Sequence, residues 1–190
     1  GDAAIIAGGQ SLLALLNFRL AAPELLIDIG RLAELKQLSE QDGHIEIGAL
    51  VRHCDIATSP LIAREMPLLH QAVGHIAHPA VRHRGTIGGS LAMADPAAEL
   101  GACCLALDGQ FSLISVRGQR WVAADVFFQG VYETALQEDE ILAAIRLPKL
   151  APGRISIFEE TARRRGDFAM AGLALAAQVQ NGGRRQVRLA

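Results

Sequence analysis

Two adjacent glycines between an apolar β-branched pair and a run of leucines constrain the fold near the start of the chain. Ile5 and Ile6 are typical of a buried strand, and the leucines that follow recur near helical spacing. Gly8 and Gly9 therefore mark a strand-to-helix turn, where glycine tolerates positive φ and close approach to the backbone. Such a turn suits an anion beside unpaired N–H groups, and a tight turn with Ser11 near the cap is an equally open interpretation.

The composition indicates a globular protein and argues against polyanion binding. The 190 residues are 51% hydrophobic, which is ample for one large domain or two small ones. A formal net charge of −2 and only 4% aromatic residues give no electrostatic or stacking reason to expect nucleic acid or an anionic membrane. Neither a membrane-length apolar run nor a signal peptide is present, so we expect a cytoplasmic protein.

The three cysteines fit neither a disulfide framework nor a metal site. Cys103 and Cys104 are adjacent, and no CxxC spacing occurs. We expect all three to be buried packing residues in a reducing compartment.

The chain begins without methionine and stops within an apparent hairpin, so we also expect a fragment of a longer protein.

Hydrophobic periodicity predicts a mixed α+β chain. A second buried strand at 24–30 completes a parallel βαβ unit, and alternation around Asp42-Gly43 predicts a hairpin. Residues 60–76 keep a helical period, with a break at Glu65 because Pro67 follows closely. Further along we expect a hairpin around 117–119, a short helix at 125–128, a strand at 140–148, and an alternating segment from 153 with a hairpin turn at 181–182.

A second Gly-Gly pair repeats the opening pattern. Gly88 and Gly89 are followed by Ser90, and Asp95 is predicted to be the N-cap of a helix whose first turn is "PAAE". Two such turns in one chain favour a ligand site over two ordinary turns.

The paired motifs carry a resemblance to a known family. "AGGQSL" (7–12) and "RGTIGGSL" (84–91) are joined by "NFRLAAPELLIDI", "ADPAAEL", "FFQGVYETALQEDEILAAIRLP" and "RRRGDFAMAGLA". The ordered set resembles the FAD-binding medium subunit of the molybdenum hydroxylases, the group that includes carbon monoxide dehydrogenase and the flavin domain of xanthine dehydrogenase.

This resemblance implies an α+β fold of the FAD-binding PCMH type. It divides the chain into an N-terminal βαβ subdomain at 1–49, a second α+β subdomain at 50–150, and the start of a C-terminal domain with a small antiparallel sheet at 151–190. Family chains carry a further strand and helix before the first glycine turn and a longer final domain, so we expect both to be missing here.

The resemblance also implies a cofactor site between the two glycine turns, whose backbone N–H groups would bind the FAD pyrophosphate. The expected cofactor-binding residues are Ile5, Ile6, Ala7, Gly8, Gly9, Gln10, Ser11, Leu12, Ile76, Thr86, Ile87, Gly88, Gly89, Ser90, Glu99 and Leu142. Glu99 would accept a hydrogen bond from a ribose or ribityl hydroxyl. A solvated carboxylate at Glu99 and a plain core role for Leu142 remain alternatives.

One position departs from the family pattern. Many relatives carry lysine in the strand that reads "FEETARRRGD" here, and Glu160 stands nearest that position. A carboxylate in place of an ammonium group near the flavin would lower its reduction potential.

His75, His78 and His83 crowd the approach to the second turn, but they lack an accompanying ligand set, so we expect no metal site.

The implied function is electron transfer rather than substrate chemistry, so no catalytic acid, base or nucleophile is expected. Electrons from a large molybdopterin subunit would pass through a small [2Fe–2S] subunit to FAD here and then to an external acceptor, in a dimer of heterotrimers. The alternatives are a stand-alone flavin oxidase or reductase of the same fold, a nucleotide-binding module without redox work, and an inactive remnant.

Overall fold

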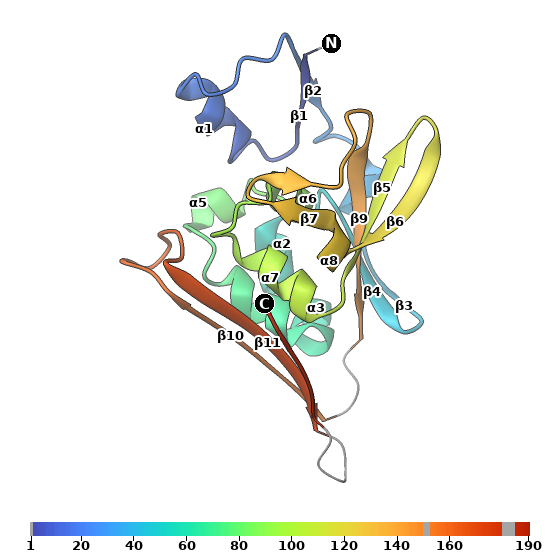
Figure 1. The fold of residues 1–190 in the computed structure, drawn as a ribbon, viewed down its shortest axis with the longest axis vertical. Helices are drawn as coiled ribbons and strands as arrows, with labels where there is room; N and C mark the ends of the chain where they lie inside the picture. Colours follow the sequence, from blue (N-terminus) through green and yellow to red (C-terminus); the bar gives the residue numbers. More distant parts are fainter. Residues whose placement is uncertain (1, 150–152, 180–184) are drawn as a thin grey trace.

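The computed structural model describes residues 2–149, 153–179 and 185–190. It opens with the expected parallel unit, in which β1 (Ala3–Ile6) pairs with β2 (Leu25–Asp28). The helix α1 (Leu12–Asn17) connects them. This unit lies at one end of the molecule, beside the N-terminus in Figure 1. The predicted strand-turn-helix-strand order is confirmed, but the expected burial of the two strands was wrong: Ile5 and every residue of β2 are exposed, because this two-stranded unit packs little against the rest of the described chain.

An antiparallel five-stranded sheet forms the frame of the molecule. Its order is β3 (Leu38–Gln41), β4 (His44–Gly48), β9 (Ile141–Pro148), β5 (Gln110–Ser115) and β6 (Gly118–Ala123), and the 3-10 helix η1 (Ala33–Lys36) precedes it. The predicted hairpins β3–β4 and β5–β6 are confirmed. Because β4 pairs with β9, hydrogen bonds cross the expected boundary at residue 49, and the subdomain bounds stay a prediction.

Short helices cover one face of this sheet (Figure 1). They are α2 (His53–Thr58), α3 (Pro60–Glu65), α4 (Pro67–Val73), α5 (Pro79–Arg82), α6 (Ile87–Met93), α7 (Glu99–Ala106) and α8 (Ala124–Phe127). A two-stranded ribbon, β7 (Phe128–Gly130) and β8 (Glu133–Thr134), follows α8. The predicted break after Glu65 is confirmed, because α3 ends there and Pro67 begins α4. No helix in the described ranges has the length and apolarity to cross a membrane.

A second antiparallel sheet packs against the helices from the other side (Figure 1). Its strands are β10 (Arg154–Thr161), β11 (Ala171–Val179) and β12 (Arg185–Leu189), and Phe158, Ala174 and Ala176 are buried on it. The expected turn at Asn181-Gly182 lies outside the described residues. The fold is therefore α+β with a small antiparallel sheet after residue 150, as expected.

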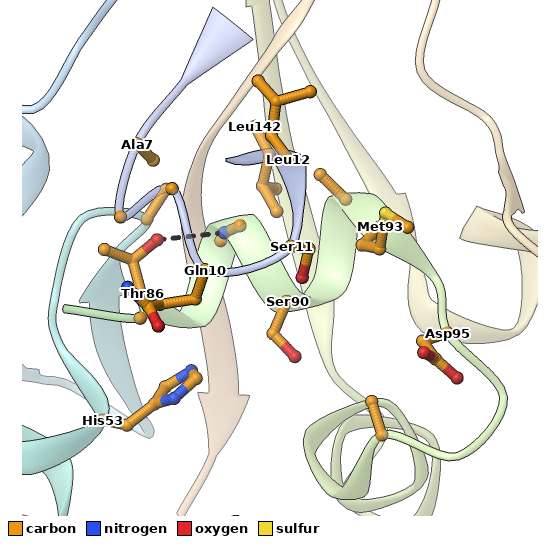
Figure 2. Close-up of a pocket in the computed structure, with 18 of the residues that line it drawn as sticks. Ala7, Gln10, Ser11, Leu12, His53, Thr86, Ser90, Met93, Asp95 and Leu142 are labelled. Carbon is orange, nitrogen blue, oxygen red and sulfur yellow. Dashed lines mark hydrogen bonds between the residues drawn. The ribbon is translucent and has the colours of Figure 1, made fainter. Parts of the chain in front are cut away.

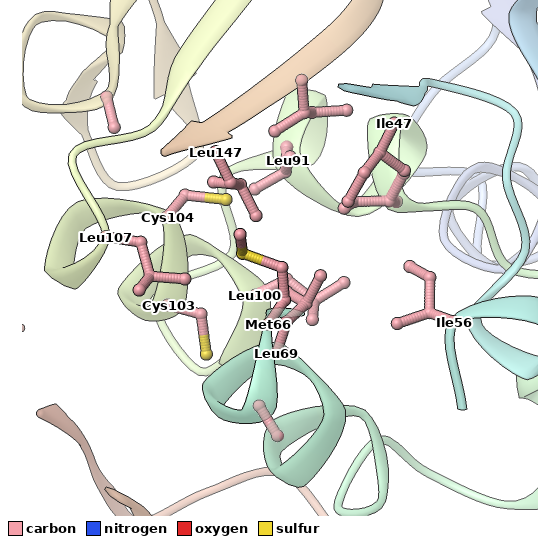
Figure 3. Close-up of a cluster of buried hydrophobic side chains, with 14 of the residues drawn as sticks. Ile47, Ile56, Met66, Leu69, Leu91, Leu100, Cys103, Cys104, Leu107 and Leu147 are labelled. Atoms are coloured by element: carbon pink, nitrogen blue, oxygen red, sulfur yellow. The ribbon is translucent and has the colours of Figure 1, made fainter. Parts of the chain in front are cut away.

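The core lies between the five-stranded sheet and the helices. Figure 3 shows Cys104 of α7 pointing toward Leu147 of β9, with Leu69 and Leu100 in the same cluster. Cys103 and Cys104 are fully buried, as expected, but Cys54 is only half-buried, so its assignment as a core residue was wrong. Cys54 lies on the outer part of α2, where its thiol faces the Asp55 carboxylate at 3.6 Å.

Phe111 is the centre of an aromatic cluster and gives a test of this core. Its ring meets those of Phe127 and Phe128 edge to face, at centroid distances of 4.5 and 5.8 Å. Truncating it removes a fully buried ring and leaves a cavity, so Phe111→Ala should lower the free energy of unfolding by about 3–5 kcal/mol. Urea denaturation measures this. Val116→Ala, at an almost fully exposed turn position, should change it by less than about 0.5 kcal/mol. Equal losses in both variants would contradict the assigned core.

Candidate functional site

A cavity of about 510 Å³ opens between the first glycine turn, α6 and the start of β9 (Figure 2). This volume lies within the range of small-molecule and cofactor sites. The expected site residues that line it are Ile5, Ala7, Gly8, Gly9, Gln10, Ser11, Leu12, Ile76, Thr86, Gly88, Gly89, Ser90, Glu99 and Leu142. The structure thus brings residues of the first glycine turn together with residues of the second turn, α7 and β9. Two expected residues, Ile6 and Ile87, do not line it, and Ile87 is fully buried in the core.

The first glycine turn leaves a row of backbone donors without protein partners. Gly9 has φ of +73°, so the turn needs glycine there. Among the hydrogen bonds of the described residues, none uses the backbone N–H of residues 8–12. Ser11 is the N-cap residue of α1, but its hydroxyl accepts no hydrogen bond from the helix. Ser11 thus stands at the cap position, as the alternative expected, but its side chain does not cap the helix, so the donors and the hydroxyl are free to bind an anion.

The second glycine turn is different, because its donors are already used. Gly88 and Gly89 lie in the first turn of α6, whose N-cap Thr86 accepts a hydrogen bond from the Gly89 N–H. The Ile87 N–H donates to the Val51 carbonyl at 3.0 Å, and the Gly88 N–H donates to the Ala49 carbonyl at 2.9 Å. The expectation that both turns offer backbone N–H groups was wrong for these three residues, because the first two dock α6 on the chain that follows β4 and the third is taken by the Thr86 cap.

The glycines of the two turns meet different neighbours. A Cβ on Gly88 would overlap the Ala49 side chain and lie 2.7 Å from the Ala49 carbonyl oxygen, so glycine allows α6 to dock there. A Cβ on Gly8 would overlap the Arg84 carbonyl, so the first turn rests directly on the segment before α6. A Cβ on Gly89 would lie 2.9 Å from the Thr86 hydroxyl oxygen and 4.0 Å from Cβ of Ala7, so only a side chain would have to shift there. Gly8 and Gly88 thus serve packing, and Gly89 borders the cavity.

Acidic side chains border the far side of the cavity. Asp95 was expected to cap a helix, but α7 begins at Glu99 with Ala98 as its N-cap. Asp95 instead accepts from the Ala97 N–H at 2.9 Å and from the Tyr132 hydroxyl at 3.2 Å, which fixes the loop before α7. Burial raises the pKa of Glu99 to about 7, and the carboxylates of Glu160 and Asp95 add to the shift.

Two further carboxylates near the cavity contact neighbouring side chains. Glu140 lines the cavity, but a two-pronged contact from Arg120 holds its pKa at about 2. Glu160 does not line it: its side chain is 5% exposed, with one carboxylate oxygen 3.5 Å from Nδ1 of His75. The described residues contain no group of three or more His, Cys, Asp or Glu side chains able to hold a metal.

Two parts of the cavity wall were missed by the sequence reasoning. Gly166, Asp167 and Phe168, in the loop after β10, lie in its lining, and Gly166 packs against Ala77. The "RRRGDFA" motif enters the sequence analysis only as part of the family resemblance, although its glycine also indicates a position where the backbone packs closely against another segment. His53 also lines the cavity, and a single histidine in an amphipathic segment gave no signal.

Comparison with known proteins decides the family. Residues 1–150 match the family described as the FAD binding domain in molybdopterin dehydrogenase. The chain belongs to this family. FAD is the cofactor of the family, and the cavity described above lies mostly within the matched residues.

Individual relatives agree with this assignment. The chain is 44% identical over 173 residues to the 6-hydroxypseudooxynicotine dehydrogenase complex subunit alpha of Paenarthrobacter nicotinovorans, covering 91% of this chain and 58% of the relative. It is 42% identical over 174 residues to the carbon monoxide dehydrogenase medium chain of Hydrogenophaga pseudoflava, covering 92% and 61%. The chain thus spans about three fifths of the length of these relatives.

Solved structures share the fold. Carbon monoxide dehydrogenase from Hydrogenophaga pseudoflava superimposes with a TM-score of 0.95 at 40% identity, covering 100% of this chain and 67% of that one. Quinoline 2-oxidoreductase from Pseudomonas putida 86 gives a TM-score of 0.92 at 41% identity, covering 99% and 65%. The fold shared with these structures extends over nearly the whole chain.

The raised pKa of Glu99 predicts a pH-dependent stability of the cofactor-free protein. The folded state binds the Glu99 proton more tightly than the unfolded state, whose value is near 4.5. The free energy of unfolding therefore falls as pH rises from about 4.5 to about 7. Below this window the stabilising contribution of protonated Glu99 is complete. Glu99→Gln should remove this fall, so unfolding curves of the two proteins should diverge across the window. Parallel pH profiles would contradict the assignment.

Proposed function

We propose that this chain is the FAD-holding part of the medium subunit of a molybdenum-containing hydroxylase. In this role it takes electrons from the [2Fe–2S] clusters of a small partner subunit and passes them through FAD to an external acceptor. A large molybdopterin subunit would supply the electrons from its substrate. One observation carries the proposal: the backbone N–H groups of residues 8–12 have no partner among the described residues. These residues line a cavity of a size that suits a cofactor, in a chain of this family.

The cavity residues fit the parts of FAD. The N–H groups of the first glycine turn and the Ser11 hydroxyl are donors for the two phosphates, and Ser90 adds a hydroxyl from α6. The lining contains neither lysine nor arginine among the described residues, so backbone dipoles replace side-chain cations. Ile76 and Leu142, both buried, offer apolar surface for a ring, and Glu99 offers an acceptor for a sugar or ribityl hydroxyl.

Bound FAD would supply one- and two-electron redox chemistry. The chain's own residues would bind the cofactor, orient it and exclude water from its apolar surface. None of the cavity residues is assigned a proton-transfer or nucleophilic role, because the substrate chemistry would take place in the large subunit. The names of the relatives, which include medium chains and complex subunits, support membership in such an assembly.

Gly89 tests the position of the cofactor. Gly89→Val places a branched side chain in the space between α6 and Ala7 and displaces the Thr86 cap, which costs about 1 kcal/mol of stability. The protein should still fold, but its affinity for FAD should fall at least tenfold, measured by quenching of flavin fluorescence during titration. Gly101→Ala, in α7 and outside the cavity, should leave FAD affinity unchanged. Equal affinity in all three proteins would reject the proposed site.

Glu160 tests the electrostatics of the bound flavin. Replacing its buried carboxylate by an ammonium group favours the reduced, more negative flavin, so Glu160→Lys should raise the flavin reduction potential. Glu160→Gln removes only the negative charge and should give a smaller rise, while disturbing the core less. Redox titration of the reconstituted protein measures both. An unchanged potential in both variants would show that Glu160 lies too far from the flavin to tune it.

A further inference from the structure

His53 is a buried ring in the cavity wall whose nitrogens make no hydrogen bond within the part of the chain that the structure describes. It begins α2, its residue is 5% exposed, and it lines the cavity. Neither Nδ1 nor Nε2 has a hydrogen-bond partner among the described residues. Buried polar atoms in folded proteins are nearly always paired, and leaving one unpaired costs about 1–3 kcal/mol. A partner for this ring is therefore expected from whatever fills the cavity.

Packing places His53 where the two glycine turns meet. A Cβ on Gly8 would lie 3.0 Å from Cα of Gly85, so the first turn contacts Gly85. A Cβ on Gly85 would lie 3.0 Å from both Nδ1 and Cε1 of His53, so the ring contacts the same glycine. In Figure 2 the ring extends from α2 toward Thr86, at the start of α6. The ring and the first turn thus contact the same glycine, Gly85.

The ring is neutral at physiological pH. Burial lowers the pKa of His53 to about 4; a contact with the Thr86 backbone acts in the opposite direction, and the nearby Arg82 guanidinium lowers the pKa further. A neutral imidazole has one N–H donor and one acceptor nitrogen. The free groups of the adjacent turn are all donors, so the ligand there must present acceptors, and the ring's N–H can add to that row.

We propose that His53 donates a hydrogen bond to a phosphate oxygen of the bound dinucleotide, as a cofactor-binding residue in addition to the glycine turns. This inference rests on the proposed function. The residue also explains how a cavity lined without lysine or arginine binds a diphosphate: a neutral donor replaces a cation, so the site gains a hydrogen bond without burying a further charge.

A phenylalanine at position 53 separates the polar role from packing. His53→Phe keeps a planar ring but removes both orphaned nitrogens, so the cofactor-free protein should be at least as stable as the wild type. Its affinity for FAD and for ADP should fall at least tenfold, measured by flavin fluorescence quenching and by calorimetry on flavin-stripped protein. ADP carries the diphosphate without the flavin, so a loss for FAD alone would overturn the assignment to phosphate.

His70→Phe is the matched control. His70 lies in α4 outside the cavity, and one ring nitrogen, Nε2, is 3.1 Å from the Ala57 carbonyl oxygen. This variant should lose stability and bind FAD and ADP as the wild type does. Unchanged affinity in a folded His53→Phe protein, with FAD binding intact in the wild type, would overturn this inference alone. A wild-type protein that binds no FAD would reject the proposed function as well.

Nitrogen NMR gives a second measurement that does not depend on a variant's folding. In the wild-type protein, adding ADP should move the protonated ring nitrogen of His53 and its proton to the shifts of a hydrogen-bonded N–H, while His70 stays unchanged. If His53→Phe fails to fold, His53→Leu takes its place in the titrations, with an expected loss of affinity for both ligands because leucine has no donor. No shift of the His53 ring on ADP addition would overturn the proposal.

Discussion

The docking of α6 onto the chain that leaves β4 organises the site. Two backbone hydrogen bonds, from Ile87 and Gly88 to the carbonyls of Val51 and Ala49, hold the first turn of α6 against the frame of the molecule. The contact is so close that any side chain at Gly88 would overlap Ala49. Because these donors are consumed, α6 shapes the cavity but contributes few N–H groups to it. The free backbone N–H groups belong instead to the first glycine turn.

Three segments far apart in the sequence enclose the cavity around this anchor. The first turn rests on the segment before α6 through Gly8 and Arg84, and the loop after β10 rests on Ala77 through Gly166. Each contact brings backbone against backbone, which only glycine permits. The start of β9 supplies the apolar wall through Leu142, which is held in the centre of the five-stranded sheet.

The electrostatics of the cavity depend on which of the nearby carboxyl groups already contact a basic side chain. Arg120 engages Glu140, and His75 lies beside Glu160, so Glu99 is the lining carboxylate whose protonation burial favours. The described lining holds no lysine or arginine. A site of this kind discriminates by hydrogen-bond geometry more than by net charge, because backbone N–H groups and neutral rings have fixed directions.

The sequence by itself determined the elements and the family. Alternation and turn dipeptides identified both hairpins of the large sheet, and the strand at Ile5 and Ile6 followed by glycines identified the first turn, because these signals are local. The paired glycine motifs pointed to the matched family over residues 1–150. Even the break after Glu65 followed from the sterics of one proline.

Tertiary structure decided which groups are free to act. The second glycine pair looks like the first in sequence, yet its N–H groups are used by the carbonyls of Ala49 and Val51, far from it along the chain. Asp95 has the spacing of a helix cap, but Tyr132 and the Ala97 N–H engage it before α7 begins. His53 has no sequence signal, and only packing against Gly85 leaves its ring buried and unpartnered at the cavity. The physical reason is the same in each case. Whether a polar group is free depends on which other groups the fold brings within hydrogen-bond distance, and the local sequence pattern does not determine that.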